Sequence, residues 1–286
     1  MEAPEVSIVI ATYNRLKQLQ KVLPSYLTQS CLKELIIVDD GSTDETREFC
    51  QKHYSSNKQV HYLRHPQHQG TPFAKNTGIA YASGNFICIG EDDLYFSGDY
   101  VRTLLDEMNS HNADIAGGRL IYLNKEESLP DAARRVGQSL NDKQYLNPYT
   151  LAINYYGKGD TAYPVPILHA CVLLKASVAK ELLIDTVFTI SCLREETDLY
   201  LRAGKRGHKV LYVPRTSVYH LPMRRMKGGS RDGSALTYHL SAIRNNYIFS
   251  KRHFGYLKEI GIRTNFLMFN TLHALNRLRI YFRRNI

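Results

Sequence analysis

The chain has 286 residues, of which 43% are hydrophobic and 22% charged, as in ordinary globular proteins. No apolar run approaches the roughly 18–20 residues that a helix needs to cross a bilayer, which argues against helical membrane spans. The net charge of +10 is unevenly placed. Residues 215–286 hold 14 basic residues and two acids, a surplus that predicts contact with phosphate in a nucleotide, a nucleic acid or an anionic membrane.

The first residues and the cysteines favour a reducing compartment. The opening MEAPE is acidic and leads directly into a strand-like run, unlike a secretory signal. The five cysteines are an odd number and show no CxxC spacing. We therefore expect free thiols and a cytoplasmic protein.

Strand and helix patterns alternate over the first hundred residues. Ser42 or Thr43 is expected to cap the second helix, and Gly84 to close the third. This alternation is typical of a parallel, doubly wound α/β sheet, in which ligands bind at the carboxyl ends of the strands. The predicted strands are 6–10, 35–38, 60–65 and 85–89, and the predicted helices are 15–29, 43–54 and 71–84.

The rest of the chain divides into a second set of elements. Residues 124–165, rich in Asn, Asp, Gly, Tyr and Pro, predict a long irregular region of the kind that often binds ligands. We expect a catalytic domain over residues 1–222 and a basic helical extension over 223–286. The predicted elements are a strand at 115–122, a strand and helix within 167–183, a helix at 195–203, a strand at 209–213, and helices at 235–254 and 256–284.

Three consecutive acids, Glu91, Asp92 and Asp93, follow the fourth predicted strand. Their mutual repulsion would be relieved by a cation. Oxygen ligands without Cys suit a hard divalent ion, Mg²⁺ or Mn²⁺. The alternative is a solvated acidic turn.

Four segments of the sequence together resemble one known family. They are "VSIVIATYNR", "LIIVDDGSTDET", "GTPFAKNTGIAYASGNFICIGEDD" and "EETDLYLRAGKRGHKVLYVP…SVYH", in that order across about residues 5–220. In this order and spacing they look like family 2 glycosyltransferases with the GT-A fold. The resemblance implies a Rossmann-like, mostly parallel sheet flanked by helices. It also implies inverting transfer of a sugar from a nucleotide diphosphate sugar to a hydroxyl of a glycan or lipid-linked acceptor.

The resemblance implies a nucleotide site at the ends of the first strands. Tyr13 would stack on the base, a contact worth about 1–3 kcal/mol in other systems. Asp40 would accept a hydrogen bond from an imide N–H, which favours uracil or thymine, with guanine as the alternative. Lys75 could meet a phosphate, although a helix-surface lysine is the plainer interpretation. The nucleotide-binding residues implied are Thr12, Tyr13, Asn14, Arg15, Asp39, Asp40, Lys75, Asn76, Asp92 and Arg231.

The family's metal motif is DxD or a variant, and here Glu91-Asp92-Asp93 occupies its place, with Glu91 instead of the usual first acid. The resemblance implies Mn²⁺ or Mg²⁺ on Asp93, with Asp92 on the ribose or the metal and Glu91 as the third acid. His220, after the last strand, would complete the metal site. Without the resemblance, a lone histidine is more often a packing or surface residue.

Inverting transfer needs a carboxylate to take the proton from the attacking hydroxyl. The family takes it from an acidic motif that opens a helix, and "REETDL" matches that motif. We expect Glu196 to be the base and keep Asp198 as the alternative. At helical spacing Glu195 and Asp198 share one face, while Glu196 points about 100° away. Acids that stabilise a helix N-terminus are the structural alternative.

The basic C-terminal region allows further interpretations. The loop "RRMKGGSR" could close over a diphosphate through Arg224, Arg225, Lys227 and Arg231, or could be a solvated loop. The last helix, with an apolar face and terminal arginines, predicts attachment to an anionic membrane. Alternatively, that face packs on the catalytic domain or a partner subunit. The pattern rests on Phe266, Phe269, Leu272, Leu275, Leu278, Arg277, Arg279, Arg283 and Arg284.

Two other functions compete with glycosyl transfer. A sugar nucleotidyltransferase would share the fold class, but its first strand would end in a glycine-rich loop, whereas "ATYNR" lacks glycine. A nucleic-acid-binding module would use the basic, aromatic-containing tail. We expect no nucleic acid partner.

Overall fold

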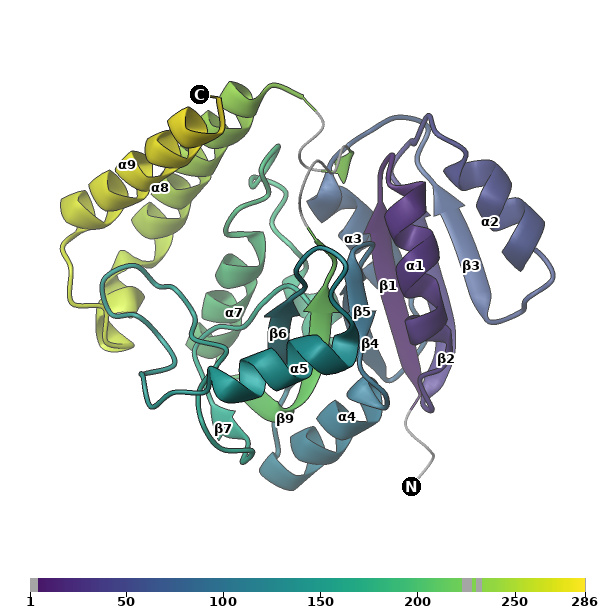
Figure 1. The fold of residues 1–286 in the computed structure, drawn as a ribbon, viewed down its shortest axis with the longest axis horizontal. Coiled ribbons are helices and arrows are strands. Elements are labelled where there is room, and N and C mark those ends of the chain that lie inside the picture. Colours follow the sequence, from purple (N-terminus) through teal and green to yellow (C-terminus); the bar gives the residue numbers. More distant parts are fainter. Residues whose placement is uncertain (1–4, 223–227, 230–232, 286) are drawn as a thin grey trace.

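The structure is a computed structural model that describes residues 5–222, 228–229 and 233–285. In this part of the chain a nine-stranded sheet forms the centre and helices flank it (Figure 1). The strands are β1 (Val6–Thr12), β2 (Leu32–Asp39), β3 (Val60–Arg64), β4 (Phe86–Glu91), β5 (Leu94–Phe96), β6 (Ile115–Tyr122), β7 (Tyr163–Pro164), β8 (Val172–Lys175) and β9 (Val210–His220).

The N-terminal half is the predicted parallel α/β unit. The strands β3-β2-β1-β4 pair in that order, and all their pairs are parallel. They alternate with α1 (Leu16–Leu27), α2 (Thr46–Tyr54) and α3 (Thr71–Tyr81). The expected caps are wrong in detail. Glu45 occupies the N-cap of α2, and α3 ends at Tyr81 with Ala82 as its C-cap.

Beyond β4 the sheet becomes mixed. Strand β8 lies antiparallel to β4 and β6, β9 is parallel to β6, and β5 and β7 pair antiparallel with β9. The further helices are α4 (Tyr100–His111), α5 (Leu129–Gln138), α6 (Ala176–Leu182), α7 (Glu195–Lys205), α8 (Ala235–Glu259) and α9 (Phe266–Asn285).

Helix α5 lies inside the region expected to be irregular. Its start has the usual signals, because the Ser128 hydroxyl accepts a hydrogen bond from the Asp131 N–H and Pro130 stands in the first turn. Only Ala132 and Val136 are buried, so the apolar stripe is too short to stand out in the sequence.

Helices α8 and α9 lie side by side, and α8 also contacts α7 (Figure 1). Phe249, Leu257 and Phe269 belong to the same buried cluster as residues of the central sheet. The apolar core therefore continues across the proposed boundary at residue 222, and the division into two domains stays a prediction. No helix in the described residues is long and apolar enough to span a bilayer.

Candidate active site

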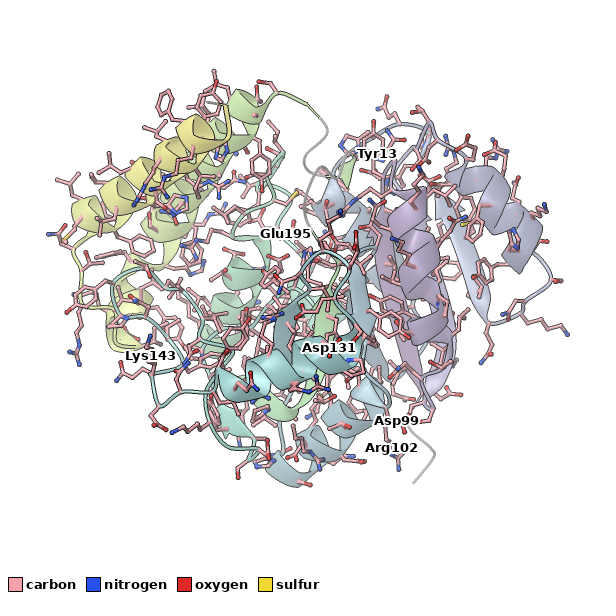
Figure 2. The ribbon with its side chains drawn as sticks, in the orientation of Figure 1. Tyr13, Asp99, Arg102, Asp131, Lys143 and Glu195 are labelled. Atoms are coloured by element: carbon pink, nitrogen blue, oxygen red, sulfur yellow. The ribbon has the colours of Figure 1, made fainter. Side chains whose placement is uncertain are left out.

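A cavity of about 480 Å³ opens at the carboxyl ends of β1 and β4 and at the start of α7. Tyr13 and Glu195, from opposite halves of the molecule, both line it (Figure 2). The strand ends therefore converge on one cavity, as the sheet type predicts. The predicted site residues in its lining are Thr12, Tyr13, Arg15, Asp40, Lys75, Glu91, Asp92, Asp93, Glu196 and His220.

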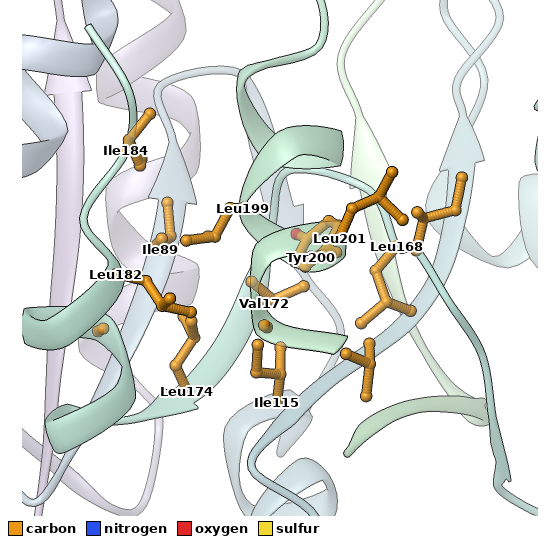
Figure 3. Packing of buried hydrophobic residues seen from close by; sticks show 14 of the residues in the cluster. Ile89, Ile115, Leu168, Val172, Leu174, Leu182, Ile184, Leu199, Tyr200 and Leu201 are labelled. Carbon is orange, nitrogen blue, oxygen red and sulfur yellow. The ribbon is translucent and has the colours of Figure 1, made fainter. Parts of the chain in front are cut away.

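Helix α7 is fixed against the sheet by apolar contacts below the cavity. Leu199, Tyr200 and Leu201 are buried and pack in the same cluster as Val172 and Ile115 of the sheet (Figure 3). Because these three residues stand in the second turn of α7, they hold its acidic first turn at the cavity.

The turn that carries the three acids is held by Tyr26 of α1. Its hydroxyl accepts a hydrogen bond from the Glu91 N–H and lies 2.8 Å from the Leu94 carbonyl oxygen. A Cβ at Gly90 would lie 2.8 Å from the Tyr26 ring, so only glycine permits this approach. Asp92 and Asp93 are buried, whereas Glu91 is partly exposed.

Arg15 lies between the two aspartates. Its guanidinium makes 2.6 Å ion pairs with Asp92 Oδ1 and Asp93 Oδ2, and Thr12 donates to Asp92 Oδ2 at 2.9 Å. Burial raises the pKa of Asp92 to about 7, against the opposing effect of Arg15. In the described residues no group of three or more His, Cys, Asp or Glu side chains is arranged to hold a metal ion.

The donor chemistry beside Asp93 nevertheless fits a divalent cation. His220 Nδ1 lies 2.7 Å from the Leu221 carbonyl oxygen, and a hydrogen bond there requires Nδ1 to carry the proton. In the neutral ring this leaves the Nε2 lone pair 3.7 Å from Asp93 Oδ2. A backbone-bonded imidazole beside carboxylates is a common arrangement of metal ligands.

Lys75 joins the two acidic segments from below. It is almost completely buried, and its ammonium lies 2.7 Å from Glu195, 3.3 Å from Glu196 and 3.4 Å from Glu91. The sequence predicted Lys75 near the nucleotide phosphates. In the structure its ammonium contacts the acids of β4 and α7 at the cavity lining, and contact with a phosphate stays a prediction.

The two glutamates of α7 have different surroundings. Glu195 is buried, and burial raises its pKa to about 8, against the opposing effect of Lys75. Its Oε2 has no hydrogen-bond partner among the described atoms. The Glu196 side chain keeps 24% exposure and lines the cavity. Glu196 is thus the acid of α7 that a substrate hydroxyl can reach.

Asp198, the alternative base, lies outside the cavity lining. Its buried carboxylate pairs with Arg202 Nε at 2.6 Å and His253 Nε2 at 2.7 Å. These contacts lower its pKa although burial opposes them. The position of Asp198 is that of a link between α7 and α8.

At the other end of the cavity, Tyr13 stacks on His68 with ring centroids 4.0 Å apart. Asp40 beneath them accepts hydrogen bonds from the Gln69 and Gly70 N–H groups and pairs with His65 and His68 at 2.7 Å. The side chain of Asp40 therefore shapes the turn that carries His68.

Three other predicted nucleotide residues do not line the cavity. Asp39 is buried and bonds to Tyr62 and Arg64. The Asn14 side chain accepts a hydrogen bond from the Thr43 N–H, and that of Asn76 bonds to the backbone of Ile184. These side chains hold the loops around the site in place.

The predicted basic loop falls mainly outside the described residues. Arg224, Arg225, Lys227 and Arg231 are not described. Gly228 and Gly229 are described, and the Gly229 N–H donates to the Tyr13 carbonyl oxygen at 2.8 Å. A Cβ at Gly228 would lie 2.3 Å from the Asn14 carbonyl oxygen. The two glycines thus permit this segment to approach the end of β1.

Several lining residues carry no signal in the sequence. His68 belongs to none of the sequence motifs, yet it lines the cavity beside Tyr13. Tyr122 stacks on His220 at 5.0 Å, and Tyr155 packs edge-on to His169. Burial lowers the pKa of His169 to about 4, so it is neutral at physiological pH. Of these residues, only Tyr155 lies within residues 124–165, the region expected to bind ligands.

The sequence model of "Glycosyl transferase family 2" matches residues 7–176. The chain belongs to glycosyl transferase family 2. Among curated relatives, it is 28% identical over 210 residues to the glycosyltransferase GlyA of Streptococcus pneumoniae. The aligned residues make up 73% of this chain and 29% of GlyA. It is 30% identical over 120 residues to a GalNAc(5)-diNAcBac-PP-undecaprenol β-1,3-glucosyltransferase of Campylobacter jejuni, covering 41% of this chain and 39% of that protein.

This family 2 chain thus spans less than half the length of these two relatives. Among solved structures, it resembles GalNAc-T7 bound to UDP, GalNAc and Mn²⁺, with a TM-score of 0.66 and 15% identity over 98% of this chain and 58% of that one. That likeness confirms the GT-A fold. Membership of this family favours glycosyl transfer over the nucleotidyltransferase and nucleic-acid alternatives.

Proposed function

We propose that this family 2 enzyme is an inverting glycosyltransferase that moves a sugar from a nucleotide diphosphate sugar to a hydroxyl group. The observation that carries the proposal is that the acids at the end of β4 and at the start of α7 face one cavity, on either side of Lys75. The acids at the end of β4 suit a cation and a diphosphate. The acids at the start of α7 supply a carboxylate that can remove the proton of the attacking hydroxyl, as direct displacement at the sugar requires.

The donor would lie along the ends of β1 and β4. Tyr13 and His68 offer ring faces to a base, and an imide such as that of uracil or thymine would replace one of the histidines that now bond to Asp40. Asp93 and His220, with Asp92, would hold Mn²⁺ or Mg²⁺, whose charge stabilises a departing diphosphate. Binding of the ion would replace the present ion pairs of Asp92 and Asp93 with Arg15.

Glu196 would act as the base. It takes the proton from the acceptor hydroxyl as that oxygen bonds to the anomeric carbon, and the electrons of the broken C–O bond leave with the diphosphate. The ammonium of buried Lys75 lies 3.3 Å from the Glu196 carboxylate and fixes its position at the cavity. Burial raises the pKa of Glu195, so this carboxyl is more readily protonated than an exposed glutamate.

The acceptor would be a glycan or a lipid-linked sugar. The cavity wall opposite the strand ends includes Tyr155, Ile153 and Leu168, surfaces on which a sugar ring or an apolar segment could lie. The named substrate of the Campylobacter jejuni relative is undecaprenol-linked. All five cysteines are free thiols, which favours the cytoplasm and, for a lipid-linked acceptor, the inner face of the membrane.

Replacing the base tests the proposal. Glu196→Gln should lower kcat by about 10²–10⁴-fold, the usual contribution of a general base, while donor binding stays nearly unchanged. Transfer would be measured with UDP- and dTDP-sugars, Mn²⁺ and a panel of glycan and polyprenyl-linked acceptors. Glu181→Gln, at an exposed glutamate of α6, is the matched control. Substantial turnover by Glu196→Gln would assign the base elsewhere.

Replacing a metal ligand tests the donor site. Asp93→Asn should abolish the metal-dependent rise in melting temperature that a nucleotide sugar produces, because a ligand bound only to the folded state stabilises it. The screen would compare UDP, dTDP, GDP and their sugars with and without Mn²⁺. Asp106→Asn, at an exposed position of α4, is the control. An unchanged metal requirement in Asp93→Asn would overturn the assignment.

A further inference from the structure

The outer side of α8 and α9 carries an unusual share of exposed apolar side chains. Eight of the fourteen large hydrophobic residues that are exposed in the described part of the chain belong to these two helices. Leu267 is 75% exposed, Leu275 59% and Phe282 57%. Apolar residues gathered in this way mark an interaction site more often than scattered ones do.

Contacts between the helices show which way these side chains face. Asn246 and Ser250 of α8 bond to Asn270 of α9, and this defines the seam between the helices. Phe249 and Phe269 lie to one side of the seam, in the core. At about 100° per residue, the exposed residues lie on the other side of the seam. Six of the eight are Leu236, Leu240 and Tyr247 on α8, and Leu267, Leu275 and Phe282 on α9, while Met268 and Leu272 lie nearly opposite the seam on α9.

The two apolar stripes therefore adjoin across the seam and form one outer face. Side chains along the outer side of α9 point away from the body of the molecule (Figure 2). The sequence pattern had assigned Phe269 to this face. In the structure Phe269 is buried, and α8 supplies part of the face that the pattern of α9 alone could not show.

Basic residues border this face on both sides. By the same helical spacing, exposed Arg244 and Lys251 follow the stripe of α8, and exposed Arg279 and Arg283 follow the stripe of α9. Residues 235–286 hold nine Lys and Arg residues against Glu259, a net charge of +8. An apolar stripe bordered by cations is typical of helices that lie in a membrane interface.

We propose that the outer face of α8 and α9 docks on an anionic lipid bilayer. The apolar side chains enter the headgroup boundary, and the bordering arginines and lysine contact lipid phosphates. The charge argues against a second copy as the occupant, because a twofold contact would set the four basic residues that border this face against the same four of the other copy. The proposal stands apart from the chemistry of the cavity, and it places the enzyme where lipid-linked acceptors are found.

Vesicle co-sedimentation of the full chain tests this surface. The chain should bind phosphatidylcholine vesicles that contain one quarter phosphatidylglycerol, bind pure phosphatidylcholine weakly, and lose affinity as salt rises from 50 to 500 mM, conditions chosen to span the screening range. Leu267→Ser with Leu275→Ser should weaken binding about tenfold or more through lost apolar burial. Arg279→Glu with Arg283→Glu should weaken vesicle binding to a similar extent, because the attraction between these side chains and lipid phosphates is lost.

Matched controls lie away from this face. Tyr149→Ser removes a side chain of 48% exposure, and Lys125→Glu with Arg134→Glu reverses two exposed charges, so both should bind as the unaltered chain does. Vesicle binding that is absent, or that survives both double substitutions, would overturn the proposal. A dimer in sedimentation velocity that Leu267→Ser with Leu275→Ser converts to a monomer would assign the face to a second copy instead.

The nucleotide-sugar melting shift separates this proposal from the catalytic one. Vesicle binding needs no donor, and each double variant should keep the shift, which also shows that it folds. A chain that binds vesicles but no nucleotide sugar would keep the docking face and remove the proposed function.

Discussion

A single buried ammonium organises the acids of the candidate site. Lys75 contacts one carboxylate from β4 and two from α7, and each pair lies within 3.4 Å. A buried lysine is costly unless its charge is paired, so this position depends on all three acids. The same contacts keep Glu195 buried and leave Glu196 as the more exposed of the two glutamates that line the cavity.

The raised pKa of Glu195 predicts a dependence of stability on pH. Its pKa is about 8 in the folded protein against an ordinary value of 4.5, so the folded state binds more protons between these values. Stability should therefore fall as pH rises from 5 to 8. Glu195→Gln should remove part of that fall, measured as melting temperatures of both proteins at pH 5.5 and 8. An equal fall in melting temperature for the unaltered protein and Glu195→Gln would show that the pKa of Glu195 is not raised in the folded state.

The sequence predicted which residues gather at the cavity, but it did not predict which of their side chains contact one another. The acids that end the fourth strand were expected at the cavity because parallel strand ends share an edge, whereas Glu196 and His220 were expected there from the family resemblance. The contacts of Lys75 join residues 120 and 121 positions apart, and no local pattern encodes them. Pairing of Arg15 with the aspartates was missed for the same reason.

Helix α7 is held at its first turn by the C-terminal helices. Arg194, just before the helix, donates to Asn246 at 3.0 Å and lies over the rings of Phe249 and Phe269. One turn later, Asp198 pairs with His253 of α8. Helix α8 thus positions the segment that presents Glu196, although it lies far along the chain.

Breaking this link between α7 and α8 should lower the melting temperature and leave the catalytic rate nearly unchanged. Asp198→Asn leaves Arg202 and His253 without their buried carboxylate, and removal of one partner of a buried pair typically costs about 3–5 kcal/mol. We expect a lower melting temperature and retained turnover at low temperature, measured by thermal denaturation and initial rates. A normal melting temperature with lost turnover would instead make Asp198 the base.

Elements with strong periodicity were predicted well, and those with weak periodicity were not. Helices α1, α3 and α7 are close to their predicted bounds, because leucine spacing or terminal signals mark them. Helix α5 was missed, since it buries only two residues. The length of β9 was also underestimated, because pairing with β5 and β6 extends it to His220.

For the whole molecule, the sequence predicted the class of fold and the end of the sheet that carries the site. It could not predict the antiparallel insertion of β8 between β4 and β6, which depends on contacts distant in sequence. Nor did it show that the core includes Phe249, Leu257 and Phe269 of the C-terminal helices. Because of that packing, deletion of these helices would disturb α7, and point substitutions on the outer face are the cleaner experiment.

The central claim is that one cavity brings the acids of β4 and α7 to opposite ends of a single donor. A crystal structure of the chain with Mn²⁺ and the nucleotide diphosphate chosen by the melting screen tests it most directly. We expect the ion on Asp93 and His220, the diphosphate beside it, and Glu196 facing the far side of the sugar position. Nucleotide bound elsewhere, with Arg15 still bridging Asp92 and Asp93, would contradict it.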